Sequence, residues 1–119
     1  MVVATVGGGK YKPLMLHDAA SLTYEFELNV VSSFLAIQQA VPYMTSGGSI
    51  VCLSSNAAGN VTPWMAAYMM AKIAVENLVR GAAEELGAAG IRVNAIRPGL
   101  TRTDRGGATS YDPRVVDPV

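Results

Sequence analysis

Three residues near the middle of the chain have side chains that could together move a proton. Ser55 follows a run of apolar residues, Tyr68 comes thirteen positions later, and Lys72 comes four positions after that. Residues four apart lie on the same face of an α-helix, so the tyrosine hydroxyl and the lysine ammonium are expected to be close together. A nearby cation favours the phenolate form of a tyrosine, which makes the tyrosine usable as a general acid or base near neutral pH.

Glycine and polar residues mark the ends of the predicted strands. Three apolar runs predict buried strands: residues 2–6, 49–53 and 91–96. They are followed, in order, by Gly7-Gly8-Gly9, Ser54-Ser55 and Arg97-Pro98-Gly99. In open α/β sheets ligands bind outside the carboxyl ends of the strands, so three marked ends predict one site. The glycines allow the backbone to approach a ligand closely, although a turn needed only for chain geometry remains an alternative.

Two long amphipathic segments connect these strands. The first predicted helix spans residues 21–43, with Ser21 as its N-cap and an interruption near its end at Pro42. Its apolar residues predict one buried stripe: Phe26, Val30, Phe34, Ile37 and Val41. The second predicted helix spans residues 66–88 and ends at a glycine cap within residues 87–90. The order strand, helix, strand, helix, strand predicts three parallel strands with right-handed crossovers.

The array of Ser55, Tyr68 and Lys72 resembles the catalytic Ser…Tyr-x-x-x-Lys signature of the short-chain dehydrogenase/reductase family. Asn29 in the preceding helix, and residues 94–103 at the end of the last strand and beyond it, match further positions of that family in the same order. The resemblance covers essentially the whole chain. It implies an α/β fold, a partial Rossmann-like doubly wound parallel sheet that forms one βαβαβ half. It also divides the chain into a catalytic half, residues 1–103, and a truncated substrate-loop segment, residues 104–119.

The same resemblance implies hydride transfer between a nicotinamide cofactor and a carbonyl or alcohol carbon of a small molecule. Tyr68 would exchange the proton and Ser55 would hold the substrate oxygen. Lys72 would bind the nicotinamide ribose, and Asn29 would support a water molecule behind this lysine. These four residues are the expected catalytic set. The expected cofactor-binding set is Gly7, Tyr68, Lys72, Pro98, Gly99, Thr101 and Thr103. The family's Asn-Asn-Ala-Gly corresponds here to residues 4–7, Ala-Thr-Val-Gly, or to the same frame shifted by one or two residues. This departure removes asparagines that help to hold the strand beside the cofactor.

The sequence contains one βαβαβ half, whereas a dinucleotide fold needs two. The glycine-rich fingerprint for the pyrophosphate is missing, and so is the residue that selects the cofactor, so NAD or NADP is expected. The chain is therefore interpreted as the C-terminal half of such an enzyme, and the isolated 119-residue chain is expected to be inactive. The alternative is a non-catalytic module that keeps the motif for packing or dimerisation. By resemblance, a homo-oligomer would form through the two long helices.

Composition restricts the classes of partner. Half of the residues are hydrophobic and 15% are charged, while nine basic and nine acidic residues cancel. This balance predicts neither a nucleic-acid partner nor a membrane partner. The single cysteine, Cys52, excludes an intrachain disulfide, fits a cytoplasmic location, and lies mid-strand where a packed apolar role is expected. The lone His17 has no partner at metal-ligand spacing, so no metal site is predicted. No apolar run is long enough to predict a membrane span.

Overall fold

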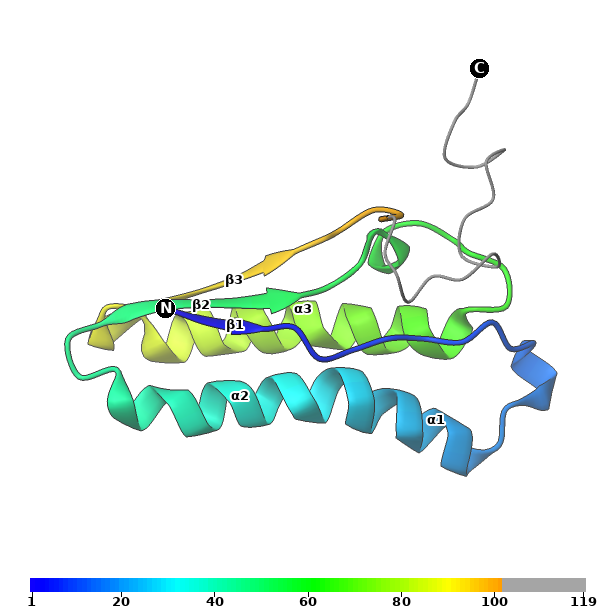
Figure 1. Cartoon of the computed structure of the whole chain (residues 1–119), viewed down its shortest axis with the longest axis horizontal. Helices are drawn as coiled ribbons and strands as arrows, with labels where there is room; N and C mark the ends of the chain where they lie inside the picture. The colour runs from blue at the N-terminus through cyan, green and yellow to red at the C-terminus, as the bar shows by residue number, and fades with distance from the viewer. Residues whose placement is uncertain (102–119) are drawn as a thin grey trace, which may run out of the picture.

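The computed structural model describes residues 1–101 as three parallel strands that lie on one layer of helices (Figure 1). The regular elements are β1 (Val2–Ala4), α1 (Ala19–Phe26), α2 (Ser32–Ala40), β2 (Gly48–Leu53), α3 (Ala66–Leu86) and β3 (Ile91–Ile96). A π-helical segment, Glu27–Val31, joins α1 directly to α2. Short 3-10 turns lie at Leu14–Leu16, Val41–Tyr43, Asn56–Ala58 and Gly87–Ala89. The substrate-loop segment predicted at residues 104–119 lies outside the described residues.

The sheet has the order β1-β2-β3, with β2 in the middle. Ile50 of β2 pairs with Val2 of β1 and with Val93 of β3, and both pairings are parallel. The predicted α/β fold with three parallel strands is thus confirmed. The predicted first strand is too long, since β1 ends at Ala4 instead of Val6. Beyond Ala4 the chain leaves the ladder, because the backbone of Gly8 bonds to the Asn29 side chain instead of to a strand.

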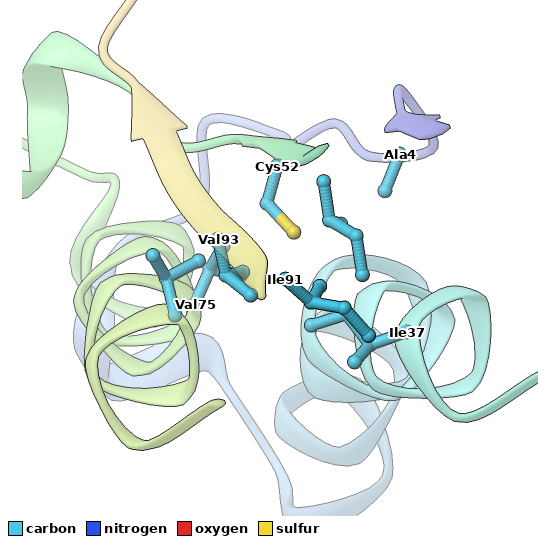
Figure 2. Close-up of a cluster of buried hydrophobic side chains, with 8 residues drawn as sticks. Ala4, Ile37, Cys52, Val75, Ile91 and Val93 are labelled. Atoms are coloured by element: carbon cyan, nitrogen blue, oxygen red, sulfur yellow. The ribbon is translucent and has the colours of Figure 1, made fainter. Parts of the chain in front are cut away.

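The core lies between the sheet and the helices α2 and α3 (Figure 2). Its buried members are Ala4, Ile37, Ile50, Cys52, Val75, Val79, Ile91 and Val93. Each aliphatic side chain of the size of valine or isoleucine contributes about 1.5–3 kcal/mol when it is fully buried. Cys52 is fully buried among them, as its mid-strand position predicted. In Figure 1 all three helices lie on the same side of the sheet, so the opposite face carries no helix from the described residues.

The predicted N-cap of the first helix is wrong. The helix begins at Ala19, and Asp18 is its N-cap. The amide of Ser21 donates to Asp18 Oδ1 at 2.8 Å, while the amide of Asp18 donates to Ser21 Oγ at 3.1 Å. This reciprocal arrangement is a capping box, in which an aspartate forms the cap and a serine occupies the third helical position. Ser21 therefore belongs to the first helical turn and does not precede it.

The π-helical segment changes which residues of α2 face the core. The predicted stripe assumed a continuous α-helix, but one wide turn at Glu27–Val31 shifts the helical phase. As a result Phe34 is 44% exposed, whereas its neighbour Ser33 is only 2% exposed. The buried face runs instead at intervals of four residues: Glu25, Asn29, Ser33 and Ile37. The predicted stripe is thus correct at Ile37 and wrong at Phe34.

The second predicted helix agrees closely with α3. The predicted helix ran to residue 88, and α3 ends at Leu86 with a 3-10 turn after it. Gly90 then closes the helix end with a φ of 71°, a left-handed conformation that glycine adopts without a steric penalty. The buried positions Ala71, Val75 and Val79 follow the predicted spacing. Within residues 1–101, no helix is both long and apolar enough to cross a membrane.

Candidate active site

Lys72 lies at the centre of the residues that could do chemistry. Its side chain extends from α3 toward the carboxyl end of β2, where Nζ donates to the carbonyl oxygen of Leu53 at 2.9 Å. The residue is only 3% exposed, and burial lowers the pKa of its ammonium group. Nζ also lies 5.6 Å from the centre of the Tyr68 ring, within the range of a cation–π contact. Tyr68 and Lys72 thus lie one helical turn apart on the same face of α3.

The glycines after β1 pass directly between these side chains. A Cβ atom built on Gly7 would lie 2.8 Å from Asn29 Oδ1 and 2.9 Å from Lys72 Nζ. A Cβ atom on Gly9 would overlap the ring of Tyr68. Real Cβ atoms do not approach other heavy atoms so closely, so any larger residue at these two positions would displace the site side chains. The structure therefore brings Asn29, Tyr68 and Lys72 together around a glycine segment.

Asn29 is fully buried in the π-helical segment and holds the glycine segment in place. Its Oδ1 accepts from the amide of Gly8 at 3.0 Å, and its Nδ2 donates to the carbonyl oxygen of Gly8 at 2.8 Å. Nδ2 also donates to the carbonyl oxygen of Glu25 at 2.9 Å. An amide side chain has two N–H donors and an oxygen with two lone pairs, so these three bonds use both donors and one of the lone pairs. The wide π turn supplies the local geometry, and such turns are frequent at functional sites.

Ser54 and Ser55 follow β2 and have different environments. Ser55 is partly buried, and its Oγ accepts from the amide of Ala57 at 3.2 Å, which caps a 3-10 turn. A hydroxyl that accepts a hydrogen bond keeps its own proton available for donation. Ser54 is buried and points the other way, toward α3, where its Oγ donates to Glu76 Oε1 at 2.6 Å. The two serines of the sequence motif are therefore not equivalent.

An ion pair joins α3 to the end of β3. Arg97 Nε donates to Glu76 Oε1 at 2.6 Å, and Arg97 Nη2 donates to Glu76 Oε2 at 2.7 Å. This two-point geometry is the strong form of an arginine–carboxylate contact. The Arg97 guanidinium, with help from the Ser54 hydroxyl, lowers the pKa of Glu76 to about 2. The carboxylate in turn raises the pKa of Arg97.

The remaining predicted cofactor residues follow β3. The carbonyl oxygen of Pro98 accepts from the amide of Asn56, which joins the end of β3 to the turn after β2 at 2.9 Å. Gly99 is exposed, and no non-neighbouring atom of residues 1–101 lies within 4 Å of the position that a Cβ would take. Thr101 Oγ1 donates back to the carbonyl oxygen of Gly99 at 3.1 Å. Thr103, also predicted to bind the cofactor, lies outside the described residues.

Reasoning from the sequence did not identify Glu25 or Glu76, and it named Ser54 only as a residue at the end of a strand. A helical spacing could have found Glu76, because it lies four residues after Lys72 and hence one turn further along the same face. Arg97 was named only as the first residue after the last predicted strand, and no partner for its charge was predicted. Its contact with Glu76 joins residues 21 positions apart, which periodicity within one element does not reveal.

Comparison with known proteins places this geometry in a family. The family profile described as "Enoyl-(Acyl carrier protein) reductase" matches residues 1–117. A short-chain type dehydrogenase/reductase from Mycobacterium ulcerans is 39% identical, and its structure superimposes with a TM-score of 0.86 over 97% of this chain and 43% of that chain. The chain belongs to the short-chain dehydrogenase/reductase family, as the sequence motif predicted.

Two further relatives carry names that describe their activity. The 7alpha-hydroxysteroid dehydrogenase of Escherichia coli (strain K12) is 40% identical over 106 residues, which are 87% of this chain and 41% of that protein. A solved structure of 7 alpha-hydroxysteroid dehydrogenase, complexed with NADH and 7-oxo glycochenodeoxycholic acid, is 37% identical with a TM-score of 0.86. It covers 96% of this chain and 45% of that chain. The chain thus spans less than half the length of the relatives that it matches.

Proposed function

We propose that this chain carries the catalytic half of an NAD- or NADP-dependent oxidoreductase that interconverts a small-molecule carbonyl and the corresponding alcohol. The observation that carries the proposal is the buried Lys72 ammonium, held between the Leu53 carbonyl oxygen and the Tyr68 ring. Burying an ammonium group costs free energy unless the group is paired. A role in binding or catalysis would explain why a charged lysine stands at this buried position. A relative with 37% identity is complexed with NADH and a keto steroid, which supports the same chemistry here.

The residues of the site fit a nicotinamide nucleotide. An ammonium group has three N–H donors, and within residues 1–101 Lys72 uses one of them, for Leu53. The other two are suited to ribose hydroxyls. Because Gly7 has no side chain, its backbone lies close to this ammonium without a clash, and among residues 1–101 the space at Gly99 is open to a ligand at the end of β3. The bound cofactor would supply or accept the hydride at the substrate carbon.

Each chain residue then has a defined task in this proposal. Tyr68 donates a proton to the carbonyl oxygen during reduction and takes it back during oxidation. Ser55 donates its hydroxyl proton to the same oxygen, since its Oγ accepts from the amide of Ala57 and this leaves the proton available. Lys72 orients the ribose and lies 5.6 Å from the centre of the Tyr68 ring, so it helps to hold that ring in place. Asn29 is a positioning residue that holds the glycine segment against the lysine, and support of a water molecule behind Lys72 is part of the same proposal.

The active species in this proposal contains this chain together with the remaining part of a Rossmann-like fold, since the relatives are more than twice as long as the region matched. Residues 1–103 would carry the catalytic half and residues 104–119 the beginning of the substrate loop. A cytoplasmic location stays a prediction.

Substitution of Tyr68 by phenylalanine tests this function. Oxidation of NADH or NADPH is followed by absorbance with a panel of cyclic and acyclic ketones, with a polypeptide covering the other half of a relative added where the chain alone does not turn over. Tyr68→Phe should abolish turnover, because phenylalanine has no proton to give. Tyr43→Phe is the matched control, because Tyr43 is 88% exposed and lies outside the site. Wild-type turnover in Tyr68→Phe would disprove the proposal.

A homo-oligomer that forms through the helices is a separate proposal. Exposed apolar side chains on the helical layer favour it: Val31, Phe34, Leu35, Met70 and Ile73. Analytical ultracentrifugation should show an oligomer for the wild type and a monomer for Ile73→Glu, because a charge would be buried without a partner. Gln38→Glu, at an exposed position of α2, is the control and should leave the mass unchanged.

A further inference from the structure

One carboxylate, that of Glu76 on α3, contacts residues at the ends of both β2 and β3. Glu76 accepts from the hydroxyl of Ser54 and from two nitrogens of Arg97, at distances between 2.6 and 2.7 Å. The side chain of Glu76 is only 12% exposed, and Ser54 is buried. We call Ser54, Glu76 and Arg97 the carboxylate clamp. Its hydrogen bonds are charge-assisted, and such bonds are about twice as strong as those between neutral groups.

Each member of the clamp is next to a residue of the proposed reaction. Ser54 precedes Ser55, and Arg97 precedes Pro98. Glu76 lies one helical turn after Lys72 on α3. A change in the position of any clamp member would therefore be transmitted through one peptide bond or one helical turn to a group that contacts the substrate or the cofactor.

Further hydrogen bonds to backbone carbonyl groups join the same elements as the clamp. The Leu53 carbonyl oxygen accepts from Lys72 Nζ, and Ser54 Oγ lies 3.4 Å from the carbonyl oxygen of Lys72. A side chain of α3 thus contacts the backbone at the end of β2, and a side chain at the end of β2 contacts the backbone of the same turn of α3. On the other side, the amide of Ser54 donates to the Ile96 carbonyl oxygen at 2.8 Å.

Arg97 extends the same connection to the turn after β2. A Cβ on Gly59 would lie 2.6 Å from Arg97 Nη1, so the guanidinium packs closely against residues 56–59. The amide of Asn56 in that turn donates to the carbonyl oxygen of Pro98 at 2.9 Å. The ends of β2 and β3 and one turn of α3 therefore form one connected unit, with Glu76 as its only acidic member.

We propose that Glu76, through Ser54 and Arg97, is a positioning residue that sets the distance of Ser55 and of the Pro98–Gly99 turn from the Tyr68–Lys72 turn of α3. This inference rests on the proposed function for its effect on turnover. The claim that Glu76 holds the ends of β2 and β3 in position does not depend on that function. Because reacting groups must be aligned closely, a displacement of about 1 Å can reduce the rate about 100-fold.

The first test uses hydrogen exchange and needs no activity. In Glu76→Gln the side chain keeps its size but loses its charge, so the bonds to Arg97 and Ser54 weaken. The amide of Asn56 should exchange about tenfold faster than in the wild type, as expected where a local connection opens more easily. The control is Glu84→Gln, an exposed position on the same helix, which should leave this exchange rate unchanged. Unchanged exchange at Asn56 in a folded Glu76→Gln protein would overturn the inference.

The second test uses turnover, at a temperature where every variant is folded by circular dichroism. Glu76→Gln should lower kcat about 10- to 100-fold. Arg97→Lys keeps the positive charge but loses the two-point geometry, so it should lower kcat less, and it replaces Glu76→Gln in both tests if that variant does not fold. In the double variant Ser54→Ala, Glu76→Gln the two losses should not add, because both act through one contact.

The outcomes separate this inference from the proposed function. A wild-type kcat in Glu76→Gln, together with loss of turnover in Tyr68→Phe, would overturn the clamp and leave the oxidoreductase assignment standing. Wild-type turnover in Tyr68→Phe would overturn the assignment, and the exchange rate of Asn56 would still decide the clamp.

Discussion

Lys72 is only 3% exposed, and burying its ammonium group costs free energy. The cost is offset by the Leu53 carbonyl oxygen and by the face of the Tyr68 ring. Sequence spacing was sufficient to predict that this lysine and this tyrosine share a helical face. It did not predict the burial of Lys72, because burial depends on the glycine segment and on Asn29, which lie far away in the sequence.

The burial of Lys72 predicts a pH dependence of stability. Its pKa is lowered in the folded protein, so between that pKa and the ordinary value of 10.5 the unfolded chain binds more protons than the folded chain. The free energy of unfolding should therefore rise with pH across this range. Nuclear magnetic resonance titration of the Lys72 side chain should give a lower pKa in the folded protein than in urea, where it should be about 10.4. Equal pKa values in the two states would contradict the burial.

The close packing around Gly7 predicts a steric effect of a single methyl group. Gly7→Ala would place a carbon 2.8 Å from Asn29 Oδ1 and 2.9 Å from Lys72 Nζ, so the free energy of unfolding should fall by about 1–3 kcal/mol. Urea denaturation measures this change. Gly81→Ala is the matched control, because no non-neighbouring atom of the part of the chain that the structure describes lies within 4 Å of a Cβ at that position in α3, and alanine favours a helix by about 1 kcal/mol. The two variants should shift the midpoint in opposite directions.

At the scale of elements, the π-helical segment between α1 and α2 has the largest effect on the site. It turns the helix so that Asn29 faces the glycine segment and Ser33 faces the core. The Ser33 hydroxyl donates to the carbonyl oxygen of Asn29 at 2.9 Å, which satisfies a buried polar group within the same helical layer. Sequence periodicity predicted the helix itself but not this wide turn, because α-helical spacing was applied throughout and no proline or glycine marks the change.

The phase of α2 can be tested with a pair of variants. Ser33→Leu inserts a large side chain at a position that is 2% exposed, so it should lower stability by about 1–3 kcal/mol. Phe34→Ser changes a residue at the surface and should have a smaller effect. A continuous α-helix with the predicted stripe would give the reverse order. Thermal unfolding followed by circular dichroism compares the two directly.

At the scale of the whole molecule, all helices pack against one face of the sheet (Figure 1). The order and direction of the strands followed from the alternation of strands and helices in the sequence, and this part of the fold was predicted. The contacts that join the strand ends across the molecule were not, since the Glu76–Arg97 pair and the Asn56–Pro98 bond depend on how separate elements meet. Local patterns therefore gave the elements and the motif, while the connections between them required the structure.

Glu76 predicts how the whole molecule responds to acid. Its pKa is about 2 in the folded protein, compared with an ordinary value of 4.5. The stabilisation that comes from this lowered pKa is present above pH 4.5 and is lost as the pH falls through about 2. Denaturation midpoints measured from pH 6 down to about pH 2 should fall more steeply for the wild type than for Glu76→Gln. Parallel slopes for the two proteins would show that this carboxylate does not control acid stability.

The single tryptophan, Trp64, makes one place in the structure visible by fluorescence. It is the only tryptophan of the chain, it has a φ of 63°, and the residue is 64% exposed. The amide of Lys12 donates to its carbonyl oxygen at 2.7 Å, so this one ring marks the place where the loop after Gly9 meets the start of α3. All of the tryptophan emission comes from that place, four residues before Tyr68. The chain thus contains its own optical label at this point, and separation of the two loops could be followed by fluorescence without a dye.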